Sequence, residues 1–161
     1  MLMSIKESYD KLLKSKEFKN EGFLCGFFLV SDINDIENSS WQIDFYEEIT
    51  DTITSYTINN DKIEVSPKSE VFKEEKTKIE ELKLEDVKTN FKDILKKAKK
   101  LLKKAKEEAA KTIIILQKQD TPVWNISFIT KKFNILNIKI NATNGKVIEN
   151  KIVSIIKFKK E

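Results

Sequence analysis

Two stretches of the chain repeat one alternation of apolar and polar residues. The first is Trp41-Gln42-Ile43-Asp44-Phe45, and the second is Trp124-Asn125-Ile126-Ser127-Phe128, displaced by 124 − 41 = 83 positions. Strict alternation of this kind is typical of a strand with one buried face. Downstream, Asn60-Asp61-Lys62-Ile63 matches Asn144-Gly145-Lys146-Val147, displaced by 146 − 62 = 84 positions. The repeated order of strand and turn indicates a duplicated helix-and-sheet segment.

A helix is predicted ahead of each alternating stretch. Residues 4–19 begin with a capping box of Ser4 and Glu7 and continue with apolar residues in steps of three and four. Residues 90–109 begin with Asn90 as a cap and carry a longer apolar stripe on a lysine-rich helix. That stripe consists of Phe91, Ile94, Leu95, Ala98, Leu101, Leu102, Ala105 and Ala109.

Four strands are predicted after each helix. Gly22 ends the first helical segment, Asn60-Asp61 is a predicted turn, and Asn144-Gly145 is the strongest hairpin signal in the chain. A further edge strand is predicted near Val71 and Phe72. The main strands are expected at residues 23–30, 40–47, 52–59 and 62–66, and at 111–117, 123–130, 133–142 and 146–158.

The fold class that follows is α+β, with two tandem units at residues 1–75 and 76–161. Each unit has one helix packed on an antiparallel four-stranded sheet. The same pattern also fits one long curved sheet shared by both units. In either arrangement Trp41 and Trp124 point to the same face of their strand as the Ile and Phe two and four positions later. We therefore interpret both tryptophans as core residues rather than as a ligand cage.

The segment Asn141-Ala142-Thr143-Asn144-Gly145-Lys146-Val147 resembles the last hairpin of the PepSY-like module, in which a polar residue and Ala precede a turn with Gly and then Lys-Val. The resemblance covers about residues 84–150, and it is weaker in the first copy, where Asn60-Asp61 replaces Asn-Gly. The resemblance implies a cystatin-like fold, in which a helix packs on an antiparallel sheet, similar to the fold of tandem-repeat inhibitory proteins. It also implies a role in binding other proteins.

Composition excludes several kinds of chemistry. Of 161 residues, 40% are hydrophobic and 35% are charged, which describes a globular chain. The chain has no histidine, so Ser-His and Cys-His catalysis are impossible, and its single cysteine, Cys25, lies in an apolar stretch that predicts a buried thiol. The carboxylates Asp44, Glu47, Glu48 and Asp51 alternate between faces and do not suggest a metal site. We therefore expect no enzyme activity and no cofactor.

The location expected from the sequence is cytoplasmic. The first residues, MLMSIKESYDKLLK, do not resemble an export signal, and no apolar run approaches the ~18 residues of a membrane span. All 30 basic residues are lysines, a bias typical of an AT-rich genome, and the net charge is +4. Lysine cannot form the bidentate phosphate contacts of arginine, so nucleic acid is disfavoured as a partner. A membrane surface is disfavoured as well, because the small alanines of residues 90–109 suit packing on a sheet rather than insertion at an interface.

The sheet face opposite the helices is the predicted interaction site, for another protein or for self-association. In residues 23–30 and 113–116 both the odd and the even positions are apolar, so both faces of these strands are apolar. A helix covers only one side of a sheet. Either the two units cover each other, or the second face is a docking surface. The candidate residues on it are Tyr46, Ile129, Asp44, Gln42 and Asn125.

Two other classes of function fit the sequence less well. The lysine-rich face of residues 90–109, with Lys96, Lys99, Lys100, Lys103 and Lys106, could bind anionic lipid or nucleic acid. The small alanines of that helix favour packing on a sheet instead. A small-molecule carrier would require a closed apolar cavity between helix and sheet, and the sequence shows no ligand motif for one.

Overall fold

The computed structural model describes residues 2–32, 35–66, 68–70 and 78–158, and the edge strand predicted near Val71 and Phe72 lies outside them. The elements of the first half are α1 (Ile5–Leu13), β1 (Phe23–Asp32), η1 (Ile36–Asn38), β2 (Gln42–Glu47), β3 (Thr52–Asn59), β4 (Lys62–Val65) and β5 (Ser69–Glu70). Those of the second half are η2 (Leu84–Asp86), α2 (Phe91–Lys104), β6 (Ala109–Gln119), β7 (Thr121–Thr130), β8 (Asn134–Asn141), β9 (Val147–Ser154) and α3 (Ile155–Phe158).

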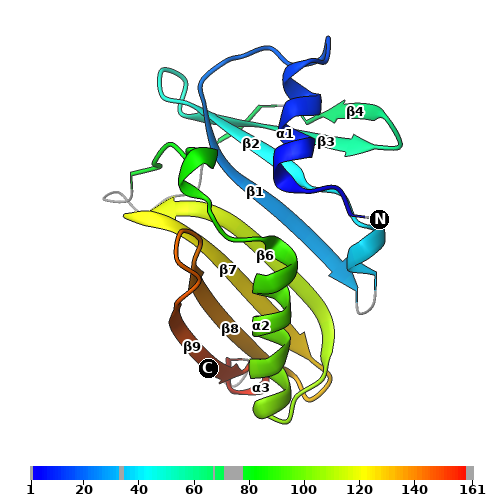
Figure 1. Cartoon of the computed structure of the whole chain (residues 1–161), viewed down its shortest axis with the longest axis vertical. Helices are drawn as coiled ribbons and strands as arrows, with labels where there is room; N and C mark the ends of the chain where they lie inside the picture. Colours follow the sequence, from blue (N-terminus) through cyan, green and yellow to red (C-terminus); the bar gives the residue numbers. More distant parts are fainter. Residues whose placement is uncertain (1, 33–34, 67, 71–77, 159–161) are drawn as a thin grey trace.

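The strands form one nine-stranded antiparallel sheet in the order β4-β3-β2-β1-β6-β7-β8-β9, with β5 paired to β3. The first strands after the two long helices, β1 and β6, pair at the centre, and the chain then moves outward on each side. The α+β class is therefore confirmed, and the sheet is continuous. Figure 1 shows α1 beside β1–β4 and α2 beside β6–β9.

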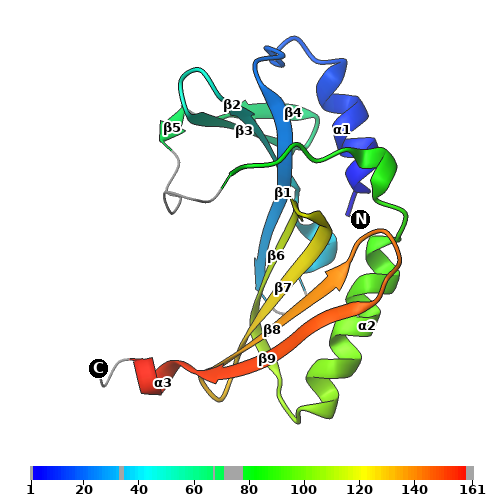
Figure 2. The same cartoon turned by 90° about the vertical axis from the view of Figure 1, so that its left-hand side faces the viewer.

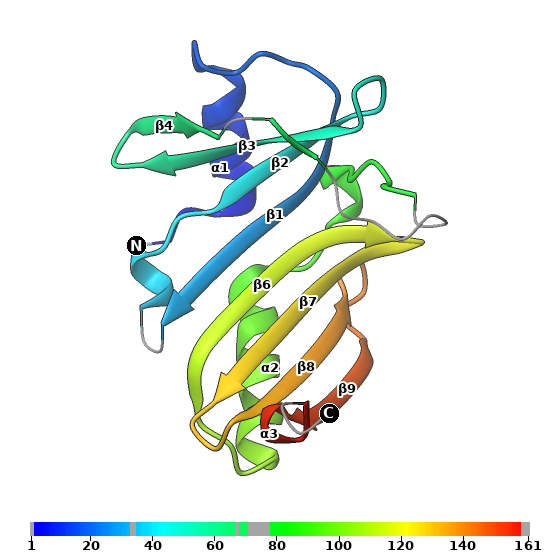
Figure 3. The ribbon, with the colours of Figure 1, turned by 180° about the vertical axis from the view of Figure 1, so that it is seen from behind.

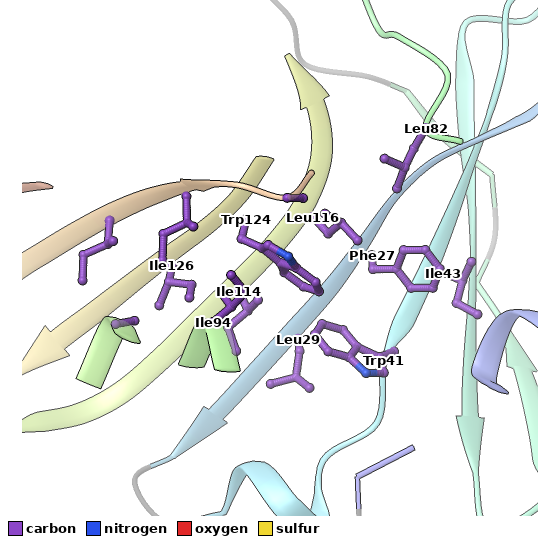
Figure 4. Packing of buried hydrophobic residues seen from close by; sticks show 14 of the residues in the cluster. Phe27, Leu29, Trp41, Ile43, Leu82, Ile94, Ile114, Leu116, Trp124 and Ile126 are labelled. Carbon is purple, nitrogen blue, oxygen red and sulfur yellow. The ribbon is translucent and has the colours of Figure 1, made fainter. Parts of the chain in front are cut away.

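The two long helices lie on the same side of this sheet, as the view in Figure 2 shows. Between them and the sheet is one hydrophobic core, in which Trp41 and Trp124 are 2% and 0% exposed. Their ring centroids are 6.1 Å apart. Figure 4 shows both indoles among side chains from strands of the two halves, such as Phe27 and Leu116. The prediction that both tryptophans are core residues is confirmed.

The first helix is shorter than the predicted range of 4–19. It stops before Ser15, whose amide (3.0 Å) and hydroxyl (2.7 Å) both donate to the carbonyl of Leu12 and so satisfy the end of the helix. Phe18, predicted to be helical, packs against Phe45 with ring centroids 5.1 Å apart. Tertiary packing of this aromatic ring therefore takes precedence over continuation of the helix.

The second helix also stops before the end of its predicted range, 90–109. Lys106 adopts a left-handed φ of 59°, and the amide of Glu107 donates back to the carbonyl of Leu102 (3.2 Å). This is the geometry of a Schellman cap, with lysine in the place that glycine usually occupies. Ala109, expected on the helix, is instead a buried residue at the start of β6.

The last hairpin differs from the predicted two-residue Asn144-Gly145 turn. Such a turn requires φ > 0 at both residues, and only Gly145 has it, at 77°. Residues 142–146 form a longer loop instead. The final strand also ends early, at Ser154. The amide of Ile155 donates to the carbonyl of Phe133 (2.8 Å), and residues Ile155–Phe158 form the short helix α3.

Candidate interaction face

The side of the sheet opposite α1 and α2 is here called the open face, and in Figure 3 it is turned toward the viewer. Among the described residues, the only helix at this side is the single turn α3, beside the end of β9. Alternation along the strands directs Gln42, Asp44, Asn125 and Ile129 to the open face, because their neighbours on the same strands belong to the core. Tyr46, two positions after Asp44 on β2, is directed to the same face by this alternation.

Two polar clusters occupy the open face, one in each half. In the first, the Asp44 carboxylate accepts hydrogen bonds from the Ser55 hydroxyl (2.6 Å) and the Gln42 amide (3.0 Å). In the second, the Asn137 amide donates to Asn125 (2.6 Å) and to Ser127 (2.9 Å).

The two clusters also correspond in sequence position. Gln42 and Asn125 differ by 125 − 42 = 83 positions, as do Asp44 and Ser127. Equivalent positions of the two alternating stretches therefore carry hydrogen-bonded polar groups on the same face, with a carboxylate in one half and a hydroxyl in the other.

Four apolar side chains lie between the clusters, on the central strands β1 and β6. Phe28 is paired with Ile115 and Val30 with Ile113, and the outer neighbours of the first pair are Gln42 on β2 and Asn125 on β7. Phe28, Ile113 and Ile115 are half-buried, and Val30 is 41% exposed. An apolar centre with a polar rim is the usual composition of a protein-binding surface. This apolar group is called the central patch.

Two of the sequence candidates contribute less to this surface. Tyr46 is only 5% exposed, packs against Phe23 with ring centroids 5.6 Å apart, and hydrogen-bonds to Asp51 through its hydroxyl. Ile129 is half-buried and pairs with Ile135 near the end of β7. The residues of the central patch were absent from the candidates, although the apolar runs at 23–30 and 113–116 were the signal that could have identified them.

Burial raises the pKa of two neighbouring groups, Asp44 and Cys25. Desolvation raises the pKa of Asp44, and the hydrogen bonds from Ser55 and Gln42 oppose that rise. Cys25 donates through its thiol to the backbone carbonyl of Asp44 (3.4 Å), and burial, followed by the nearby Asp44 charge, raises the pKa of the thiol to about 12. Cys25 is therefore a protonated thiol at neutral pH, without nucleophilic character.

The carboxylates that cluster in sequence do not form one site. Asp44 is held by Ser55 and Gln42, Asp51 is bonded to Tyr46, and Glu47 pairs with Lys68 (3.1 Å). Within the described part of the chain, no group of three or more His, Cys, Asp or Glu residues could hold a metal ion.

The lysine-rich surface lies on the other side of the sheet, along α2 (Figure 1). Lys96, Lys99, Lys100 and Lys103 are exposed, and Lys106 is exposed in the turn after the helix. Lys97 instead donates to the backbone carbonyl of Gly145 (2.5 Å), so this part of the helix is tied to the last hairpin.

A hollow of about 760 Å³ lies at the C-terminal end of α2, beside η1 and the start of β6. Its lining includes Glu107, which is 9% exposed and accepts a hydrogen bond from Asn134 (2.6 Å) through one oxygen. The other oxygen is buried without a hydrogen-bond partner among the described residues. Lys99, Lys103 and Lys106 line the same hollow, so flexible ammonium groups of the chain itself are close to this carboxylate.

Residues 92–151 match the model of the PepSY family, described as "Peptidase propeptide and YPEB domain". The matched segment contains α2 from its second residue, the strands β6–β8, the loop at residues 142–146 and the first five residues of β9. The earlier half of the chain lies outside the match. A search of curated proteins finds no match.

The whole fold is similar to a crystal structure of a "putative lipoprotein" from Clostridium difficile 630. The two chains are 16% identical with a TM-score of 0.64, and the similarity covers 94% of this chain and 93% of the other. At this identity the likeness establishes a shared fold, including both halves of the sheet. In the described part of the chain, no helix has the length and apolar character needed to span a membrane.

Proposed function

We propose that this protein is a non-catalytic, regulatory or inhibitory protein-binding module, and that its partner docks on the open face. The observation that carries the proposal is the central patch, where Phe28, Val30, Ile113 and Ile115 remain partly exposed on a sheet whose other face is covered by helices. Partly exposed apolar groups in the middle of a sheet are costly in water, and a partner removes that cost.

We infer that the chain consists of two tandem units, each of one helix and four main strands, with a boundary between residues 75 and 76; the two-residue β5 is an addition in the first unit. Two pairs of contacts support the duplication. The indole of Trp41 donates to the carbonyl of Met3 (3.0 Å), and that of Trp124 donates to the hydroxyl of Thr89 (3.0 Å). Met3 and Thr89 each precede the N-cap of their helix and differ by 89 − 3 = 86 positions.

The second pair of contacts joins each helix to its hairpin turn. Lys11 of α1 binds the carboxylate of Asp61, and Lys97 of α2 donates to the carbonyl of Gly145 (2.5 Å). The lysines differ by 97 − 11 = 86 positions and the turn residues by 145 − 61 = 84. These agree with the displacement of the helix starts and of the turns, as duplication predicts.

A peptidase is the partner class that we propose. The family description of residues 92–151 names a peptidase propeptide, and propeptides act by binding the enzyme. The open face supplies a surface for such binding. The structural relative is described as a "putative lipoprotein", which favours a location outside the cytoplasm, so we propose that location in place of the cytoplasmic one expected from the sequence.

The test compares two variants that add the same charge at equal exposure. Val30→Lys places an ammonium group in the central patch, and Leu13→Lys places one on α1; the original residues are 41% and 43% exposed. Wild type and both variants serve as baits for capture from cells that make the protein. We expect wild type and Leu13→Lys to retain a peptidase and to lower its activity on a peptide substrate, whereas Val30→Lys does neither.

Thermal denaturation of both variants checks that they remain folded. Equal capture and equal inhibition by the two folded variants would show that the open face is not the docking surface. Retention of a protein that is not a peptidase by wild type and Leu13→Lys alone would keep the docking surface and overturn the partner class.

A further inference from the structure

The strand β9 forms one edge of the sheet, and nothing in the described part of the chain pairs with its outer side. Figure 1 shows β9 at the outer border of the second half. Every residue from Val147 to Ile152 is exposed. Val147, Ile148 and Ile152 are 43%, 55% and 47% exposed, so three of the most exposed large apolar side chains lie on this one strand. A long unpaired edge strand with exposed apolar side chains is a template for pairing with another strand.

The sequence of β9 is symmetric about its centre. It reads Val147-Ile148-Glu149-Asn150-Lys151-Ile152-Val153, which has the same apolar residues in reverse order and opposite charges on either side of Asn150. When two copies of such a strand run antiparallel about a two-fold axis, each residue faces the one at the mirrored position. With the axis at Asn150, Glu149 faces Lys151 twice, and Ile148 faces Ile152 twice.

We propose that β9 pairs with β9 of a second copy of this chain, in the register that places the two Asn150 residues opposite each other. The pairing extends the sheet across the two copies and satisfies the outward amide and carbonyl groups of the edge. Apolar pairs and opposite-charge pairs across antiparallel strands are each stabilising. The symmetric sequence of β9 therefore indicates that its binding partner is β9 of an identical chain.

The charges also exclude the neighbouring registers. Directly opposed residues must share a face of the sheet, so permitted registers differ by steps of two residues. One step in one direction sets Glu149 against Glu149, and one step in the other sets Lys151 against Lys151. Like charges directly opposite each other are destabilising. Of these three registers, only the one centred on Asn150 avoids like-charge pairs, and it pairs Glu149 with Lys151 instead.

The contacts within the chain are compatible with this arrangement. Residues 149–154 pair regularly with β8, so the proposed axis at Asn150 and the Glu149–Lys151 pairs lie in the regular part of the edge. Ile148 is the extra residue of a bulge between Glu149 and Val147, so the charge pairs rather than its contact with Ile152 define the register. Glu149 is bound on its inner side by Lys139 (3.4 Å), which leaves it between that lysine and Lys151 of the second copy.

The opposite edge of the sheet makes the assembly stop at two copies. There β4 has four residues, against eight in β9, and its Ile63 is flanked by the charged Lys62 and Glu64. Among the described residues, a pair formed through β9 leaves the short strands β4 and β5 at its ends. Short edge strands offer few backbone groups for further pairing, so the expected species is a closed dimer.

Charge reversal tests the pairing. Lys151→Glu sets glutamate against glutamate twice, and we expect the dissociation constant from sedimentation equilibrium to rise about tenfold or more. Glu149→Lys combined with Lys151→Glu exchanges the two charges and restores both opposite pairs, so this double variant is expected to dimerise again. A wild type that is monomeric at all concentrations, or a double variant as weak as Lys151→Glu, would overturn the proposal.

Cross-linking tests the register. In a background with Cys25→Ala, which removes the chain's only cysteine, Asn150→Cys places two thiols opposite each other at a distance suited to a disulfide. Lys151→Cys is the matched control, because its opposite residue is Glu149. We expect oxidation to convert Asn150→Cys to a covalent dimer and to leave Lys151→Cys mostly monomeric. The reverse result, or equal cross-linking, would refute the register.

Discussion

In the first half of the molecule α1 is joined to its hairpin by two charged side chains, Lys11 and Asp61, and the side chain of Asp61 is 88% exposed. In the second half α2 is joined to its hairpin by Lys97 and the backbone carbonyl of Gly145. The loop after β8 adds the carbonyl of Ala142, which accepts from the amides of residues 88 and 89 and from the Thr89 hydroxyl (2.7 Å).

The same helix-to-hairpin geometry is therefore held by an ion pair in one half and by a hydrogen bond to backbone in the other. A contact to backbone does not depend on the side chain at the turn, whereas an exposed ion pair depends on both partners and is screened by salt. The family match at residues 92–151 covers the half in which the loop is bound to the helix start by more hydrogen bonds. We expect that half to be the more stable one.

The largest expected effect is at the two tryptophans. Trp41→Ala and Trp124→Ala each remove a buried indole, and each should lower the free energy of unfolding by about 3–5 kcal/mol. Because the rings are in contact, with centroids 6.1 Å apart, the double variant should cost less than the sum. Urea denaturation measures all three. Strict additivity would indicate that the two halves do not share a core at this point.

A smaller effect, and a clearer difference between the halves, is expected at two glycines. Gly22 and Gly145 both have φ of 77°, so alanine at either should cost about 1–2 kcal/mol of left-handed strain. At Gly22 a Cβ would lie 2.1 Å from the carbonyl oxygen of Tyr46, whereas at Gly145 the nearest atom is 3.6 Å away. Gly22→Ala should therefore cost about 1–3 kcal/mol more from overpacking. Equal melting temperatures of the two variants would contradict this difference.

The helix-to-hairpin lysines should respond differently to salt. Lys97→Met removes a part-buried charged hydrogen bond and should cost about 1.5–3 kcal/mol, while Lys11→Met should cost less, because its exposed ion pair is screened. The effect of Lys11→Met should diminish in 1 M salt and that of Lys97→Met should persist. Denaturation at two salt concentrations measures this, and an identical salt response would argue against the contrast between ion pair and backbone bond.

The smallest effect concerns the polar clusters of the open face. Since burial raises the pKa of Asp44, the folded state holds its proton more tightly than the unfolded state, and stability falls as pH rises through the folded pKa. Asp44→Asn should remove this decline, and Ser127→Asp should introduce one at the equivalent position. Unfolding between pH 4 and pH 8 measures both, and a wild-type decline that persists in Asp44→Asn would assign it to another group.

Local patterns in the sequence determined most of the elements. The alternation around Trp41 and Trp124 predicted two buried strands, and the ends of β3 at Thr52 and Asn59 are those predicted. Ser4 was predicted as a cap, and its hydroxyl accepts from the amide of Glu7 (3.1 Å). These features depend on neighbouring residues, whose preferences act over a few positions whatever the rest of the chain does.

Tertiary structure alone decided the helix ends, the last loop and the composition of the open face. α1 ended where Phe18 could join Phe45, and Tyr46 was buried although its parity is that of the open face. The central patch arose because β1 and β6 pair in the middle of one sheet, although its paired residues are 115 − 28 = 87 and 113 − 30 = 83 positions apart in the chain. Pairing between distant strands is set by the packing of the whole core, which no local window contains.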